Sequence, residues 1–174
     1  MNAEALSASA SRTLLVLRHA KSSWKNEGLA DHDRPLSSRG KRDAVHMGRE
    51  IQRRGLVPDL IICSTAKRAR STVKRILREM NADPDIQYND EIYLGDIFSH
   101  LQALSAAPDE ARSLMIVGHN PTLEELVHLL TGRDIAMPTA ALACIDLTAP
   151  HWSALRSSVT GRLRLHLVPR ELTS

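Results

Sequence analysis

Short, unbroken apolar runs alternate along the chain with segments whose apolar residues recur at helical spacing. Three runs place four apolar residues in succession, which is typical of strands buried on both faces of a sheet. They are TLLVL (13–17), DLIIC (59–63) and SLMIV (113–117). The later segments AALACIDL (140–147) and RLRLHLV (162–168) also predict strands. The last one alternates apolar with polar side chains, which predicts one solvated face and a position at the sheet edge.

Four segments between and after these runs carry apolar residues at intervals of three and four, as helices that cover a sheet do. The stripes are Ala44, Met47, Gly48 and Ile51; Ala66, Ala69, Val73, Ile76, Leu77 and Met80; Ile97, Leu101 and Leu104; and Leu123, Leu126, Val127 and Leu130. Ser37 or Ser38 can cap the first helix, and Asn120 followed by Pro121 marks the start of the fourth. This alternation predicts an α/β fold: a three-layer sandwich in which helices flank a mostly parallel central sheet with an antiparallel edge strand.

The chain has 174 residues, enough for one domain with a full hydrophobic core. We expect residues 1–12 to form a flexible N-terminal tail, because this stretch is mostly small and polar and lacks the basic start and apolar stretch of a signal peptide. Residues 13–174 are then expected to form a single catalytic domain. The segment between Pro84 and Pro108 is the only candidate insertion.

Composition narrows the classes of function. The excess of 23 basic over 20 acidic residues is too small to indicate a nucleic-acid binder, and 3% aromatic residues leave few rings for base stacking. No apolar run approaches the roughly 18 residues of a membrane span. Cys63 and Cys144 lie in apolar runs, so we expect buried free thiols and a cytoplasmic protein. No group of residues has the spacing of metal ligands, and we expect neither a metal nor another cofactor.

Polar side chains follow each of the three buried runs. Arg18 and His19 follow the first run, Lys67, Arg68 and Arg70 the second, and His119 the third. Because ligands bind at the carboxyl ends of parallel strands, these side chains converge if the three strands are neighbours. Guanidinium groups pair with phosphate oxygens, and a neutral histidine can attack phosphorus when its other ring nitrogen is held by a partner. The pattern therefore predicts a site for a phosphoryl group.

Each of these pieces has a plainer explanation when taken alone. Arg18 and His19 can be a solvated strand end, Arg68 can belong to the wet face of a helix, and His119 can be a loop histidine. Their coincidence at one edge of the sheet favours the phosphoryl site. His32, in a charged turn shortly after the first motif, is not counted among the site residues.

Four motifs, in this order, resemble the histidine phosphatase superfamily, also called phosphoglycerate-mutase-like. They are LRHAKSSW (17–24), DRPLSSRGKRDA (33–44), STAKRARST (64–72) and IVGHNPTLEEL (116–126). The similarity extends from about residue 13 to about residue 147. The short length and the form RHAKSSW are similar to the SixA-type phosphohistidine phosphatase branch.

The resemblance implies a role for each matched residue. His19 would be the nucleophile that becomes phosphorylated, and Arg18 and Arg68 would bind the phosphoryl group. His119 would hold the phosphate and the charge that develops on it. Arg70 lies outside the matched position and is only an accessory candidate.

Two positions bear on how closely the chain follows the family. Glu91, ahead of Gly95 in DEIYLGD, is a candidate general acid. SixA-type members are thought to work without that acid, because an imidazole leaves more easily than an alkoxide, and Glu91 would then be an ordinary loop carboxylate. The family usually has Gly after the nucleophile, where this chain has Ala20, and a positive φ would strain Ala there. The SixA-like branch often has Ala at this position.

The resemblance implies a metal-independent phosphatase that forms a phosphohistidine on His19 and releases inorganic phosphate. The expected substrate is phosphohistidine in a protein of a signalling phosphorelay. One alternative is a phosphatase of a small phosphomonoester, such as a sugar phosphate or a nucleotide. Another is a phosphate-binding module without catalysis. The expected partner is therefore a phosphorylated protein or a small phosphorylated substrate, and neither a nucleic acid nor a membrane.

Overall fold

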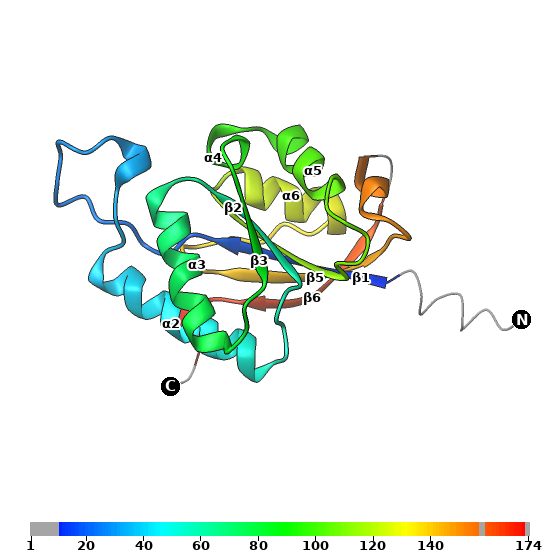
Figure 1. Cartoon of the computed structure of the whole chain (residues 1–174), viewed down its shortest axis with the longest axis horizontal. Coiled ribbons are helices and arrows are strands. Elements are labelled where there is room, and N and C mark those ends of the chain that lie inside the picture. Colours follow the sequence, from blue (N-terminus) through cyan, green and yellow to red (C-terminus); the bar gives the residue numbers. More distant parts are fainter. Residues whose placement is uncertain (1–10, 157–158, 173–174) are drawn as a thin grey trace, which may run out of the picture.

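A computed structural model describes residues 11–156 and 159–172 (Figure 1). Its sheet has six strands in the order β3-β2-β4-β1-β5-β6. The strands are β1 (Ser11–Arg18), β2 (Leu60–Ser64), β3 (Asp85–Asn89), β4 (Ser113–Gly118), β5 (Leu142–Thr148) and β6 (Gly161–Leu167). The first four in this order are parallel, β5 is antiparallel to β1, and the edge strand β6 is antiparallel to β5. The predicted α/β sandwich with a mostly parallel sheet is confirmed.

Helices cover both faces of the sheet (Figure 1). One layer contains α2 (Ser38–Arg53) and α3 (Lys67–Met80), and the other contains α5 (Ile97–Ser105) and α6 (Thr122–Thr131), with the short α4 (Glu91–Leu94). Successive side chains of β1 point to opposite faces, so Leu15 and Leu17 pack in the core under α2 and α3, and Leu14 packs in the core under α5 and α6. Within the described ranges, no helix is both long and apolar enough to cross a bilayer.

Two helices, α2 and α6, begin where the capping and proline signals in the sequence predict. Ser37 caps α2, because its hydroxyl accepts a hydrogen bond from the backbone N–H of Gly40 at 3.0 Å. The fourth predicted helix, α6, begins directly after Asn120 and Pro121. All four predicted helices are therefore confirmed, with their ends shifted by a few residues.

The first strand includes the last two residues of the expected N-terminal tail. Residues 1–10 of the expected tail lie outside the described residues, but β1 begins at Ser11, so Arg12 belongs to the sheet. Arg12 is buried, and its guanidinium donates to the carbonyl oxygens of Asp109, Ala111 and Pro150. A charged residue beside a polar stretch resembles a surface position, and only the tertiary structure reveals these acceptors.

The strand β3 was not predicted. Its sequence, DIQYN, contains only two apolar side chains, and it pairs only with β2 at the sheet edge. Such a strand is half solvated and lacks the apolar run that marks a central strand. The segment from 84 to 108 therefore completes the sheet with β3 and adds α4 and α5, and it is not an insertion.

The sheet order determines where the site lies. The strands β2, β4 and β1 are adjacent, and Arg18 at the end of β1 lies level with Gly118 at the end of β4. The segments that follow these strands consequently leave the sheet at one edge, as the sequence pattern required.

Candidate active site

His19 lies just past the end of β1 and is 8% exposed. Its backbone is fixed on both sides, because its N–H donates to Gly118 O at 3.1 Å and its carbonyl accepts from Ala140 N at 3.0 Å. Its ring Nδ1 lies 2.8 Å from the carbonyl oxygen of Ala20. A carbonyl can only accept, so Nδ1 carries the proton and Nε2 keeps a lone pair, which accepts from Nε of Arg68 at 3.4 Å.

His119 follows β4, and its ring centroid lies 5.0 Å from that of His19. Its Nε2 is 2.8 Å from the hydroxyl oxygen of Ser64, at the end of β2. Its Nδ1 is 3.4 Å from Nη2 of Arg68, which can only donate. In this tautomer His119 donates to Ser64 and presents an acceptor nitrogen to Arg68.

Both histidines are neutral at physiological pH. Burial, together with the charges of Arg68 and Arg18, lowers the pKa of His19 to about 4. Burial, with further contributions from His19 and Arg68, lowers the pKa of His119 to about 3. The unprotonated Nε2 of His19 is the form that a nucleophile requires.

Arg68 comes from the first turn of α3 and is 7% exposed. Its Nε lies 3.4 Å from Nε2 of His19, so one edge of the guanidinium faces the histidine pair. Its Nη1 donates to the backbone oxygen of Asp31 at 2.7 Å, and its Nη2 donates to Oδ2 of Asp31 at 3.0 Å. Asp31 thus holds the guanidinium in place while the Nε edge remains directed at His19.

The side chain of Arg18 is held by a hydrogen bond to the segment that follows α6. Its Nη1 donates to the carbonyl oxygen of Met137 at 2.9 Å, and Asn120 donates to the same oxygen at 3.0 Å. The Nε of Arg18 is buried and has no hydrogen-bond partner within the part of the chain that the structure describes. Arg18 itself lines the hollow that contains His19.

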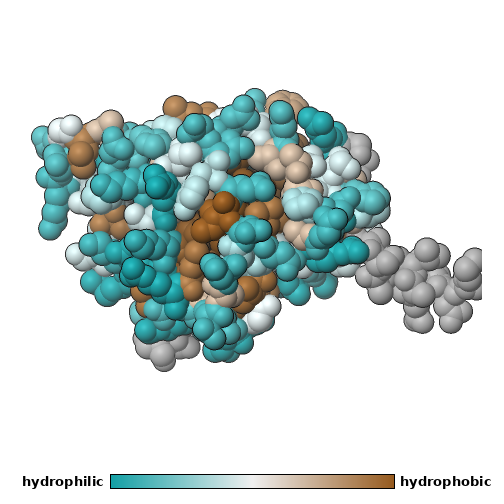
Figure 2. Space-filling view, in the orientation of Figure 1, coloured by the Kyte–Doolittle hydropathy of each residue, from teal (hydrophilic) through white to brown (hydrophobic). Residues whose placement is uncertain are grey.

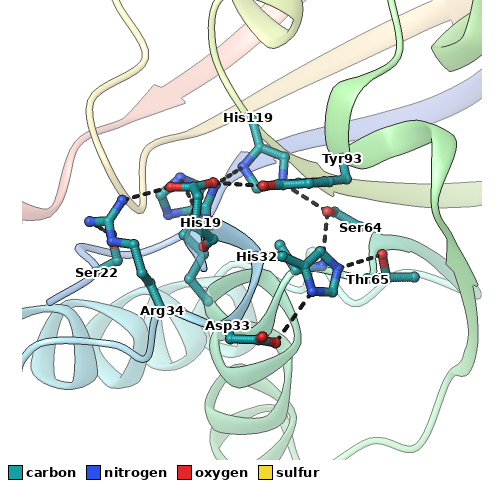
Figure 3. A network of polar contacts seen from close by, with 12 residues as sticks. His19, Ser22, His32, Asp33, Arg34, Ser64, Thr65, Tyr93 and His119 are labelled. Carbon is teal, nitrogen blue, oxygen red and sulfur yellow. Dashed lines mark hydrogen bonds and ion pairs between the residues drawn. The ribbon is translucent and has the colours of Figure 1, made fainter. Parts of the chain in front are cut away.

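Sequence reasoning missed Arg34, which lies in one of the quoted motifs. Arg34 is 7% exposed, donates to Ser22 Oγ at 2.7 Å and to Asp31 Oδ1 at 2.9 Å, and stacks 3.2 Å from the ring centroid of Trp24. Figure 3 shows His19 between Arg34 on one side and His119 on the other. The signal available in the sequence was an arginine in a charged turn close after the nucleophile.

Asp31 connects the cations of the site. It accepts from Arg34, from Arg68 and from the hydroxyl of Tyr93 at 2.8 Å. Burial raises the pKa of Asp31, but the bonds from Tyr93 and Arg34 and the charge of Arg68 outweigh burial and lower it to about 2. Asp31 is therefore a carboxylate at neutral pH, and the periodicity of the sequence had not indicated it.

Arg18, His19, Arg68 and His119 line one hollow of about 330 Å³, so the structure brings together the four residues that the motifs singled out. The remaining lining residues are Lys21, Ser22, Trp24, Arg34, Asn120 and Thr139. Three guanidinium groups and two neutral imidazoles around a small polar hollow fit a tetrahedral dianion.

Glu91 is not brought together with these residues. It is exposed on α4, and the described lining of the hollow does not include it. Its near neighbour Tyr93 contacts the site instead, with its ring centroid 5.6 Å from that of His119. Arg70 also lies elsewhere, 5.2 Å from the ring centroid of Tyr88.

Ala20 is accommodated without backbone strain. Among the described residues other than glycine, positive φ occurs only at Asn81 and Ala140, so Ala20 does not need the left-handed conformation. The N–H of Ala20 donates to the hydroxyl of Thr72 at 3.0 Å, which anchors the segment after His19 to α3.

Comparison with known proteins agrees with this geometry. The profile of the histidine phosphatase superfamily (branch 1) matches residues 14–98. An uncharacterized protein of Mycobacterium tuberculosis is 32% identical over 165 residues, which cover 88% of this chain and 100% of the relative.

Two solved structures are similar over almost the whole chain. SixA from Agrobacterium tumefaciens, a candidate phosphohistidine phosphatase, is 34% identical with a TM-score of 0.78, and the match covers 91% of this chain and 98% of that protein. SixA from Nakamurella multipartitia, described in the same way, is 29% identical with a TM-score of 0.77, over 91% of this chain and 96% of that protein. The chain therefore belongs to the histidine phosphatase superfamily and groups with its SixA-type members.

Proposed function

We propose that this protein is a phosphatase that hydrolyses phosphohistidine in a protein of a signalling phosphorelay, through a phosphohistidine intermediate on His19. The observation that carries the proposal is the hydrogen bond from Nδ1 of His19 to the carbonyl of Ala20 at 2.8 Å. This bond leaves Nε2 unprotonated, and the Nε edge of Arg68 lies 3.4 Å from it.

In the first step, the lone pair of His19 Nε2 forms a bond to phosphorus while the bond from phosphorus to the substrate's ring nitrogen breaks. The substrate imidazole leaves with that electron pair as a neutral ring, because its other nitrogen carries a proton. Arg18, Arg34 and Arg68 bind the phosphoryl oxygens and stabilise their charge in the transition state. These guanidinium groups supply the positive charge, so the proposed mechanism contains no metal and no other cofactor.

In the second step, a water molecule attacks phosphorus and the nitrogen–phosphorus bond breaks. The bonding electron pair returns to His19 Nε2, the proton of the water passes to the product or to solvent, and inorganic phosphate leaves. His119 lies 5.0 Å from His19 between ring centroids, close enough to contact the transferred group in both steps.

Two features support a phosphohistidine protein over a small phosphomonoester. An alkoxide leaving group requires a general acid, whereas a neutral imidazole does not, and Glu91 is exposed outside the described lining of the hollow. Trp24 lines the hollow and is nevertheless 69% exposed, which suits contact with a protein surface.

The two cysteines are free and buried, in keeping with the cytoplasmic location that we propose.

Trapping of the intermediate tests the proposal. Brief exposure to a protein labelled with ³²P on histidine should leave an acid-labile, base-stable label on the enzyme. His19→Ala should abolish the label and lower kcat on the order of 10³-fold or more, because the nucleophile is absent. Turnover by His19→Ala close to that of the parent would contradict the mechanism.

A substrate panel separates the proposed substrate from the alternatives. The phosphohistidine protein and free phosphoimidazole should be hydrolysed much faster than sugar phosphates and nucleotides, and Glu91→Gln should keep that activity. Faster hydrolysis of phosphomonoesters that Glu91→Gln removes would favour the small-molecule alternative. Phosphate binding without hydrolysis of any substrate would favour a binding module.

A further inference from the structure

A second hollow, of about 430 Å³, lies along α3 beside the active site. Three cations, Lys67, Arg70 and Lys74, and three largely apolar side chains, Leu77, Ile86 and Tyr88, line it. We call this hollow the basic groove. Figure 2 shows the face on which α3 and β3 lie, with apolar surface exposed in its middle and hydrophilic surface around it.

The cations of the basic groove lack carboxylate partners. Lys67, Arg70 and Lys74 are exposed on one face of α3, and within the described residues no carboxylate lies in ion-pair distance of any of them. Several other surface arginines of this helical layer are paired, as Arg49 is with Glu79 at 2.9 Å, whereas Arg42 and Arg78 have no ion pair among the described residues. The cations of the groove are therefore available to a partner.

The groove keeps a positive charge after its one acidic lining residue is counted. Asp33 also lines it, and its carboxylate lies 3.6 Å from Nδ1 of His32. Three cations less one carboxylate leave a net charge of +2 with His32 neutral. Such a charge attracts acidic groups and favours their encounter with this face.

The groove lies next to the active site, and the side chains of His32 and Tyr93 lie between the two. His32 and Thr65 line the groove, and Nε2 of His32 lies 3.0 Å from the hydroxyl of Thr65 (Figure 3). The ring of His32 packs edge-on against Tyr93 with the centroids 4.8 Å apart, and Tyr93 packs in turn against His119 with the centroids 5.6 Å apart. Lys67 is also the direct chain neighbour of Arg68. A ligand in the groove would therefore lie close to the hollow that contains His19, with His32 and Tyr93 between them.

We propose that the basic groove binds an acidic segment of the phosphorylated protein substrate. This inference rests on the proposed phosphohistidine phosphatase activity. Lys67 and Lys74 are seven residues apart on a helix, which is about 10 Å, or roughly three residues of extended chain. Apolar side chains that line the same groove as these cations suit a peptide segment that carries both acidic and apolar side chains, and a small inorganic anion would leave them uncovered.

Two peptides test the groove on the parent enzyme. Both carry the same non-hydrolysable phosphohistidine analogue, and one has glutamates on both sides of it where the other has lysines. In fluorescence anisotropy at low salt, the glutamate peptide should bind at least about 10-fold more tightly, and salt should reduce the difference. Equal affinities would contradict binding of an acidic segment in the groove and would leave the proposed phosphatase activity intact. Binding of neither peptide would contradict both proposals.

Charge-reversal variants test whether the preference for the glutamate peptide depends on the cations of the basic groove. Arg70→Glu and Lys74→Glu should each remove most of the preference for the glutamate peptide. Arg78→Glu is the matched control, because Arg78 is exposed on the same helix outside the described lining of the groove and the charge change is identical. An equal loss in Arg78→Glu would reduce the effect to overall charge and overturn the proposal.

Turnover of free phosphoimidazole completes the test. Arg70→Glu and Lys74→Glu should keep kcat/KM for this small substrate within about twofold of the parent, because it does not reach the groove. A loss as large as that measured with the glutamate peptide would assign the cations to the phosphoryl site and overturn the groove. Thermal unfolding of each variant verifies that the fold is intact.

Discussion

At the scale of single residues, Asp31 is the side chain on which the arrangement of the cations depends. One carboxylate accepts hydrogen bonds from Arg34, Arg68 and Tyr93. It therefore fixes two guanidinium groups relative to His19, and it also adds a negative charge near the place that we propose for the phosphoryl group. Orientation of the arginines by Asp31 should favour catalysis, whereas repulsion between its carboxylate and the phosphoryl group should weaken phosphate binding. Measurements of kcat and of phosphate affinity can therefore separate the two effects.

We predict that Asp31→Asn lowers kcat about 10- to 100-fold, because Arg34 and Arg68 lose a shared anchor and the transferred group is positioned less accurately. The affinity for inorganic phosphate should stay equal or increase, because a nearby negative charge has been removed. Steady-state kinetics with phosphate as a competitive inhibitor measures both quantities. A parallel loss of kcat and phosphate affinity would indicate general damage to the fold and contradict the positioning role.

Sequence reasoning could identify Arg18, His19, Arg68 and His119 because each follows a buried run or begins the helix after it. The end of a parallel strand is a position that hydrophobicity alone locates, and strand adjacency then completes the site. Asp31 and Tyr93 escaped prediction because they lie on very short helical segments, a 3₁₀ turn (Asp31–Asp33) and α4. The path of such segments depends on tertiary contacts that no periodicity encodes.

At the scale of elements, α2 is tightly packed on the segment that carries the nucleophile. Ser37, its cap, donates from both its N–H and its hydroxyl to the carbonyl of Lys21, at 2.9 Å and 3.1 Å. A Cβ atom at Gly40 would clash with the same carbonyl. The start of α2 therefore sets the position of the backbone two residues after His19.

We predict that Gly40→Ala destabilises the fold by about 1–3 kcal/mol, because α2 must move away from Lys21. It should also lower kcat, because α2 then no longer holds the backbone at Lys21, two residues after His19. Thermal denaturation and kinetics measure the two effects. Gly28→Ala is the control, because a Cβ there would meet only Asn26 Oδ1, at 3.5 Å, an ordinary contact. Parent-like stability and kcat in Gly40→Ala would show that the contact is not restrictive.

The elements that sequence patterns predicted are those with a buried face. The central strands and the four main helices have one, and their apolar spacing identified them. β3 and α4 have few buried side chains, Ile92 being the only buried residue of α4. For such elements, pairing with β2 and packing against the rest of the fold decide the structure, and the local sequence carries little signal.

At the scale of the whole molecule, β1 connects two distinct regions. One end of it delivers Arg18 and His19 to the proposed active site. The other end carries Arg12, whose guanidinium donates to Asp109 Oδ1 and Pro150 O and lies 5.2 Å from the ring centroid of Trp152. Chemistry and anchoring of the chain thus occupy opposite ends of one strand.

We predict that Arg12→Met destabilises the protein by about 2–4 kcal/mol, because buried carbonyl groups lose their donor. The kcat of the folded fraction should stay within about twofold of the parent, since Arg12 is remote from His19 along the strand. Denaturant unfolding and kinetics check both statements. Arg162→Met is the control: Arg162 has a side chain 79% exposed, and its ion pair with Asp146 should contribute little. Unchanged stability in Arg12→Met would refute the anchoring role.

The contact between His19 and Ala20 has a consequence for how this site can change. The group that selects the tautomer of the imidazole belongs to the main chain, and every amino acid supplies the same oxygen. Replacing the side chain at position 20 can crowd the site, since Ala20 is fully buried, but it cannot delete this acceptor. The backbone therefore fixes which ring nitrogen of His19, the proposed nucleophile, carries the proton. Substitutions of the side chains that line the hollow can therefore change substrate preference without changing the tautomer of His19.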